Sequence, residues 1–64
     1  MSTHDILIRM KGATTREQYA QVYAAGLRYG VEVDWAEVNA EILKHYTVSG
    51  LLFIKKLAWR QVSS

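Results

Sequence analysis

The chain contains no cysteine and no proline, and only four of its 64 residues are glycine. Without cysteine, neither a disulfide bond nor a zinc site built on thiolates can hold the fold together. No apolar stretch approaches the roughly 20 residues that a membrane-spanning helix needs. The charges within residues 1–11 are not typical of a signal peptide. We therefore expect a cytoplasmic protein that has no membrane partner.

The short length limits the chain to a single domain, residues 1–64. A domain of this size buries only roughly 60% of the surface that its unfolded chain exposes. Because half of the residues are hydrophobic, some apolar side chains must reach the surface. This composition favours a homo-oligomer or a protein partner.

Acidic residues are missing from the last third of the chain. Residues 1–41 contain four basic and six acidic residues, a net charge of −2, whereas residues 42–64 contain four basic residues and no acid, a net charge of +4. A cationic segment attracts polyanions even when the whole protein is only mildly basic. The charge pattern therefore indicates nucleic acid as a second class of partner.

The sequence predicts a mainly α fold with one short N-terminal strand. In residues 5–11, Ile6, Ile8 and Met10 fall on one face, with Leu7, Arg9 and Lys11 on the other, and this period of two is typical of a strand. The edge of such a strand would be completed by residues 31–33, by a second copy or by a partner protein.

Three helices are expected after the strand, over about residues 15–29, 35–46 and 50–62. Thr14 and Glu17 have the spacing of a capping box for the first helix, and Gly30 is placed to end it in the left-handed conformation. Asp34 and Glu37 have the same capping spacing for the second helix. A turn over residues 47–50 leads to the third, with Thr47 or Ser49 as its cap. The small residues of the first helix indicate either tight packing inside the domain or a dimer face: Ala20, Ala24, Ala25 and Gly26.

The third predicted helix carries the candidate binding residues. Leu51, Ile54, Leu57 and Ala58 lie on one stripe that faces the core. On the opposite arc a tryptophan lies among three cations, which suit phosphates and a stacked base or an apolar partner. The alternative is that Trp59 folds back over the edge of the core with lysine stems around it. The candidate residues are Ser49, Leu52, Lys55, Lys56, Trp59 and Arg60.

Residues 35–60 resemble the helix-turn-helix of small bacterial and phage regulators, with two helices, a four-residue turn and a basic second helix. The resemblance implies a regulatory, DNA-binding role in which the second helix enters the major groove. The same segment is similar to small phage reading frames, a resemblance that implies no activity. The alternative function is a protein-interaction module, either a phage-type modulator of a host protein or a homodimer, that uses an exposed apolar patch or the N-terminal strand.

Enzymatic chemistry is not expected. His4 lies near the terminus, and His45 is interpreted as a surface residue at a helix end. The glycines are scattered and form no phosphate-binding loop. We predict no cofactor. One metal site has the right spacing: without Met1, the chain would begin Ser2-Thr3-His4, a nitrogen set suited to Cu(II) or Ni(II).

Overall fold

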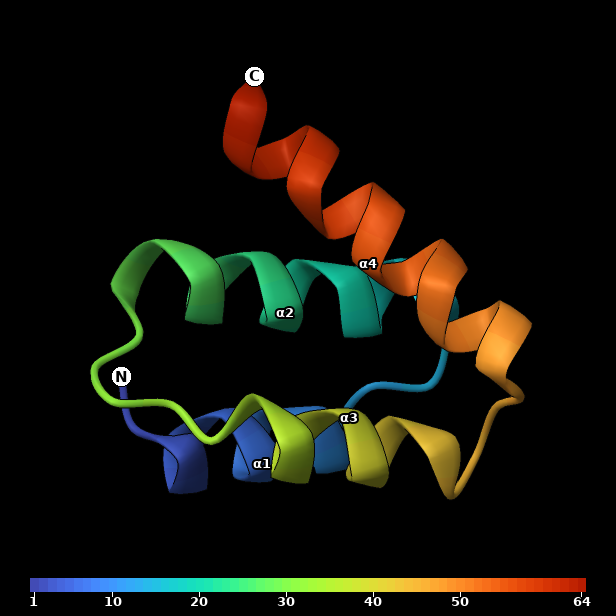
Figure 1. Ribbon diagram of the computed structural model, residues 1–64, viewed down its shortest axis with the longest axis horizontal. Coiled ribbons are helices and arrows are strands. Elements are labelled where there is room, and N and C mark those ends of the chain that lie inside the picture. The colour runs from blue at the N-terminus through green and yellow to red at the C-terminus, as the bar shows by residue number, and fades with distance from the viewer.

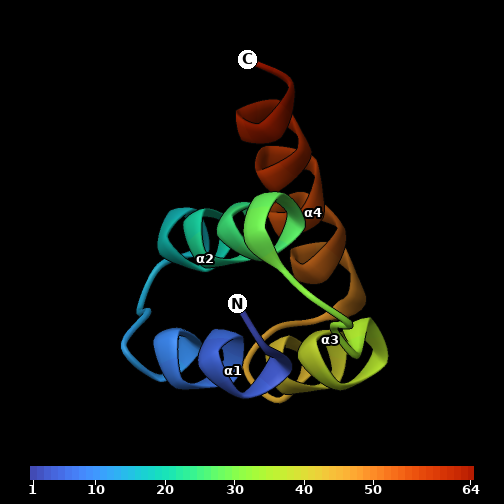
Figure 2. The same ribbon diagram turned by 90° about the vertical axis from the view of Figure 1, so that its left-hand side faces the viewer.

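The computed structural model describes residues 1–64 and contains four helices and no strand. Helices α1 and α3 lie side by side in one layer, and α2 packs over them (Figures 1 and 2). The final helix, α4, crosses α2, and its C-terminal turns project beyond the other helices. The helix bounds are α1 Thr3–Lys11, α2 Arg16–Tyr29, α3 Trp35–Leu43 and α4 Val48–Ser63.

The predicted N-terminal strand is wrong, because this segment forms α1. Ser2 caps the helix: its hydroxyl accepts from the Asp5 backbone amide at 3.2 Å, and its own amide donates to the Asp5 carboxylate at 3.0 Å. Ile6 and Met10 are buried, but Ile8 is 51% exposed. The apolar period is therefore four residues rather than two. The amide and hydroxyl of Ser2 lower the pKa of the Asp5 carboxyl below its ordinary value of 3.8.

The segment over residues 31–33 forms no sheet with the N-terminus. One backbone bond joins them, from the Val31 amide to the Met1 carbonyl at 2.9 Å, and the Met1 amine donates to the Tyr29 carbonyl at 2.9 Å. The Asp34 amide donates to the Thr3 hydroxyl at 2.9 Å. These bonds hold the start of α1 against the connection between α2 and α3.

The capping of α2 is shifted by one residue from the prediction. Thr15, not Thr14, is the cap, and Gln18 rather than Glu17 completes the box. Gly30 ends the helix in an extended conformation, with φ −70°, and Glu32 takes the left-handed conformation instead, with φ 51°. Gly30 is required by space, because a Cβ there would lie 2.2 Å from the Gly26 carbonyl oxygen.

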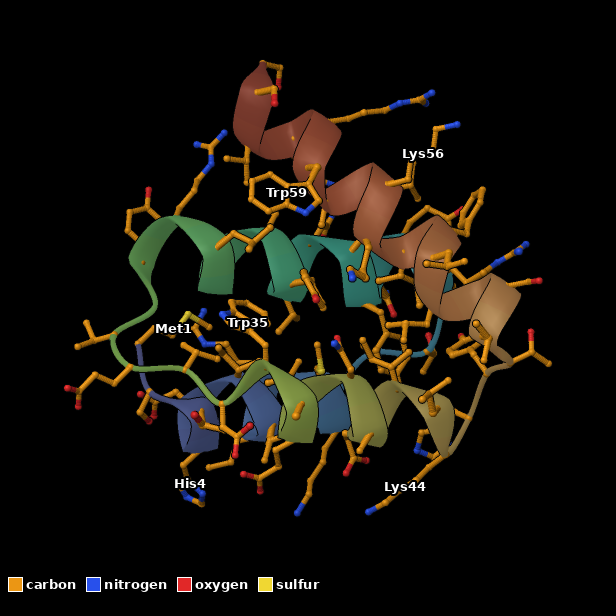
Figure 3. The ribbon with its side chains drawn as sticks, in the orientation of Figure 1. Met1, His4, Trp35, Lys44, Lys56 and Trp59 are labelled. Atoms are coloured by element: carbon orange, nitrogen blue, oxygen red, sulfur yellow. The ribbon has the colours of Figure 1, made fainter.

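The small residues of α2 serve packing inside the domain, which is the first of the two alternatives above. Ala20, Ala24 and Gly26 are buried. A Cβ on Gly26 would lie 2.8 Å from Ile6 Cδ1 and 3.1 Å from a ring carbon of Trp35. Figure 3 shows Trp35 rising from α3 toward α2. Glycine at this position therefore lets α1 and α3 approach α2 closely.

Helix α3 is shorter than expected and ends at Leu43 rather than Tyr46. Asp34 caps it as predicted, through a 3.2 Å bond from the Glu37 amide. Glu37 does not complete the box, since the Asp34 amide binds Thr3 instead. Asn39 lies on the apolar stripe because its side-chain oxygen accepts a 2.9 Å bond from the Tyr23 hydroxyl.

One core joins all four helices. Its buried residues are Ile6, Met10, Tyr19, Ala20, Tyr23, Ala24, Val38, Ile42, Leu51, Ile54 and Ala58.

Candidate interaction surface on helix α4

Helix α4 begins two residues earlier than the sequence predicted. Thr47 is the cap, and its hydroxyl accepts from the Gly50 amide at 3.3 Å. The connection from α3 is therefore residues 44–47 rather than 47–50. The earlier start adds Val48 and Ser49 to the helix, so its first turn carries an apolar residue that the sequence reading placed in a turn.

The inner stripe of α4 packs as predicted. Leu51, Ile54 and Ala58 are buried, and Leu57 packs against the core at its edge. At about 100° per residue, this stripe turns the opposite arc of the helix away from the domain. The other face of α4 is therefore determined by the packing of its inner stripe.

Four large apolar side chains of α4 are exposed. The exposed fractions are 64% for Val48, 58% for Leu52, 41% for Phe53 and 52% for Trp59. Lys56 and Arg60 are exposed among them. We call these six residues the outer surface of α4: Val48, Leu52, Phe53, Lys56, Trp59 and Arg60.

Most of the residues predicted from the sequence lie on or beside this surface. Ser49, Leu52, Lys56, Trp59 and Arg60 are exposed, and Lys55 is half-buried. Two members of the surface, Val48 and Phe53, were not among the predicted site residues. The signal for Val48 was present in Thr47 and Gly50, whose spacing fits a cap and its partner amide.

Trp59 and Lys56 do not project in the same direction. In Figure 3 the Trp59 ring lies between α4 and α2, whereas Lys56 extends from the opposite edge of α4. About half of the indole remains exposed. The tryptophan is therefore neither sealed in the core nor fully turned outward, and it combines features of the two alternatives left open by the sequence.

Arg16 at the start of α2 reaches the edge of the outer surface. Its guanidinium carbon lies 4.7 Å from the centre of the Phe53 ring, a cation–π arrangement. At the other end of α2, Arg28 donates to the backbone carbonyl of Gln61. Both ends of α2 thus contact α4.

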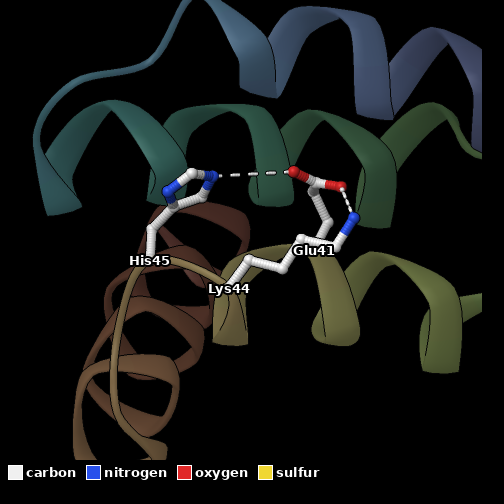
Figure 4. A network of polar contacts seen from close by, with 3 residues as sticks. All are labelled: Glu41, Lys44 and His45. Atoms are coloured by element: carbon white, nitrogen blue, oxygen red, sulfur yellow. Dashed lines mark hydrogen bonds and ion pairs between the residues drawn. The ribbon is translucent and has the colours of Figure 1, made fainter.

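The cations of α4 form no ion pair within the chain. The ion pairs of the structure join Glu41 to Lys44 at 3.2 Å and to His45 at 3.7 Å (Figure 4). Lys55, Lys56 and Arg60 take part in none. Their positive charge is therefore available to a ligand of the opposite sign.

A second group of polar side chains surrounds His45. It lines an open groove of about 510 Å³ with Tyr19 and Glu41, and its ring centroid lies 6.5 Å from that of Tyr19. Burial raises the pKa of the Tyr19 hydroxyl above 10.0. The imidazole is more than half exposed, and its nearest carboxylate is shared with Lys44. This arrangement agrees with the interpretation of His45 as a surface residue.

Metal-ligating side chains do not gather in the structure, which contains no group of three or more histidine or acidic residues suited to an ion. The N-terminal nitrogen set is also not preformed. Thr3 and His4 lie in the first turn of α1, which Ser2 caps. Wrapping their amides around Cu(II) or Ni(II) would break this cap, so metal binding here competes with the fold.

None of the four helices is both long enough and apolar enough to cross a membrane. Comparison with known protein families, with curated proteins and with solved structures finds no match to this chain.

Proposed function

We propose that the protein is a non-enzymatic interaction module that binds another protein through the outer surface of α4. The single observation that supports this proposal is the exposure of Val48, Leu52, Phe53 and Trp59 on one helix. Scattered exposed apolar residues are ordinary, but a continuous apolar patch with a polar rim is typical of a protein interface. Tryptophan and arginine are also the residues most enriched at the energetic centres of interfaces.

Nucleic-acid binding is the second candidate. Lys55, Lys56 and Arg60 form no ion pair, and residues 42–64 contain no acid. These cations suit phosphate groups, and α3 with α4 has the order of elements of the helix-turn-helix regulators that the sequence resembles. The first turns of α4, which read bases in such regulators, carry Val48 and Leu52 here. Neither offers a hydrogen bond to a base edge, and Ser49 is the one exposed residue beside them in α4 that does. We therefore take the apolar partner as the leading proposal.

The test is site-specific photo-crosslinking in a lysate of cells that naturally produce the protein. A photoreactive residue replaces Leu52, and the matched control carries it in place of Ile8, which is 51% exposed on α1. We expect a covalent adduct with one defined protein, identified by mass spectrometry, from position 52 only.

Other results would contradict the leading proposal. An adduct that nuclease removes would favour the nucleic-acid candidate, and a mobility shift with mixed DNA or RNA that weakens steeply with salt would support it independently. Equal labelling from both positions, or none from position 52, would reject the outer surface of α4 as the binding site. A cytoplasmic location is part of both proposals.

A further inference from the structure

Three residues of the outer surface of α4 form a ridge along the helix, which we define as Val48, Leu52 and Trp59. Val48, Leu52 and Trp59 are four and seven residues apart, and at about 100° per residue they fall within roughly 40° of one another. Val48 and Trp59 are separated by roughly 17 Å along the helix axis, at 1.5 Å per residue. This length corresponds to about three turns of a partner helix.

The residues of the ridge have the spacing of a coiled-coil seam. Apolar residues at alternate spacings of four and three form such a seam. Val48, Leu52, Lys55 and Trp59 follow this spacing, whereas Val62, at the next position, packs against the core. The seam therefore has one cation at its centre, where Lys55 is half-buried.

The charge beside the ridge determines the chemistry of the partner. Lys55 lies within the seam, about 20° from Val48, and Lys56 and Arg60 lie beside the ridge, about 40° and 80° beyond Leu52. A partner packed on the ridge brings its own flanking residues close to these cations. The cations of α4 attract acidic residues beside the apolar face of the partner and repel basic ones, as at the flanking positions of coiled coils.

Symmetric pairing with the α4 helix of a second copy does not suit the ridge. Pairing two α4 helices would bring their cations together with no acid from either helix, since residues 42–64 contain none.

Strand addition is also excluded as a binding mode. It requires an exposed sheet edge, and the fold contains four helices and no strand. The remaining mode that suits an apolar ridge with charged sides is an amphipathic helix laid along it.

We infer that the partner segment is an amphipathic helix of about three turns whose apolar face is bordered by aspartate or glutamate. This inference rests on the proposed protein-binding function of the same surface. It adds the conformation and the charge of the segment that is bound.

The test is a selection from a displayed library of random 16-residue peptides, with the full chain as bait. Leu52→Asp serves as the counter-selection bait, and Ile8→Asp is the matched control that retains binding. We expect peptides with apolar residues at helical spacing and acidic residues beside them, which gain helical circular dichroism on binding. Their Kd should rise at least tenfold with the triple variant Lys55→Glu, Lys56→Glu, Arg60→Glu, while its thermal unfolding remains cooperative.

The possible failures are distinct. Peptides that depend on Leu52 but are extended, or show no acidic enrichment, would overturn the inference and leave the protein-binding proposal standing. If no peptide depends on Leu52, the inference is overturned, and the crosslink from position 52 decides the proposed function separately. Displacement of the peptides by short duplex DNA, with a lower Kd for the DNA, would overturn the inference in favour of a nucleic-acid partner.

Discussion

Helices α2 and α4 form the closest pair in the fold, yet they differ in what their apolar residues contact. On α2 the buried residues include Tyr19, Tyr23 and Gly26, and Tyr29 near its end is the one large apolar side chain that is exposed. On α4 four large apolar side chains are exposed. The position of α2 between the α1–α3 layer and α4 explains its apolar content.

The apolar residues on the outer half of α4 have no such explanation in the packing of the domain. The inner stripe of α4 packs on the core, whereas Val48 and Leu52 on its outer surface are mostly exposed, and Phe53 and Trp59 are partly covered. The part of an apolar side chain that remains in contact with water contributes nothing to folding through burial. The inner residues of α4 therefore stabilise the fold, whereas the outer residues are available for binding. Truncating an inner residue should lower the stability of the protein, and truncating an outer one should leave it nearly unchanged.

The largest difference is expected within α4 itself, between Ile54→Ala and Leu52→Ala. Ile54 is fully buried, so its truncation leaves a cavity and should lower the free energy of unfolding by about 2–5 kcal/mol. Leu52 is mostly exposed, so its truncation should change that free energy by no more than about 0.5 kcal/mol. Urea unfolding followed by circular dichroism measures both values. Similar losses for the two variants would mean that the outer surface is packed in solution.

The next effect concerns the close approach of α1 and α3 to α2 at Gly26. It is tested by comparing the stability of Gly26→Ala with that of Gly12→Ala. Alanine stabilises a helix interior by up to about 1 kcal/mol relative to glycine. At Gly26 this gain is opposed by the close approach of Ile6 and Trp35, so we expect a net loss of about 1–2 kcal/mol.

Gly12 provides the matched control. A Cβ there would lie 3.6 Å from the Arg9 carbonyl oxygen, an ordinary contact, and its φ of −87° suits alanine. Gly12→Ala should therefore stabilise the protein by about 0.4–1 kcal/mol. A stabilising Gly26→Ala would show that α1 and α3 pack less closely on α2 than the structure indicates.

The sequence predicted three of the four helices and the inner stripe of α4, because long segments with helical periodicity and a cap are strong signals. The prediction of a strand where α1 lies was wrong for a physical reason. In a short segment, Ile6, Ile8 and Met10 satisfy a period of two and nearly satisfy a helical period. The Ser2–Asp5 capping box was the signal that distinguishes the two.

The candidate site was predicted less completely than the fold. Helical geometry was enough to place Leu52, Lys56 and Arg60 on the outward arc of α4. The direction of the Trp59 ring was not predictable, because it depends on where α2 crosses α4. Arg16 beside Phe53 is a contact between residues 37 positions apart, which no local pattern reveals.

A smaller effect is expected for the polar bond that joins α2 to α3. Tyr23→Phe removes the donor to Asn39 and should cost about 1 kcal/mol, whereas Tyr29→Phe on the exposed end of α2 should cost nothing measurable. Burial raises the pKa of Tyr23 above its ordinary value of 10.0. The neutral phenol is thus favoured in the folded state.

The pH dependence of this variant pair follows from that shift. The stability linked to Tyr23 is fully present below about pH 10 and is lost as the pH rises through the higher folded-state pKa. Unfolding by urea at pH 8 and pH 11 should therefore show a smaller alkaline loss for Tyr23→Phe than for the unchanged protein. An equal loss in both would assign the alkaline transition to other groups.

The smallest effect concerns the cation–π contact between Arg16 of α2 and Phe53 on the outer surface of α4. An exposed cation–π pair contributes about 0.5–1 kcal/mol. Single variants do not isolate it, since Arg16 also lies unfavourably near the positive N-terminal end of α2. The double-mutant cycle of Arg16→Gln and Phe53→Leu removes that contribution and should give a coupling of about 0.5 kcal/mol. A coupling of zero would mean that the contact between Arg16 and Phe53 does not stabilise the fold in solution.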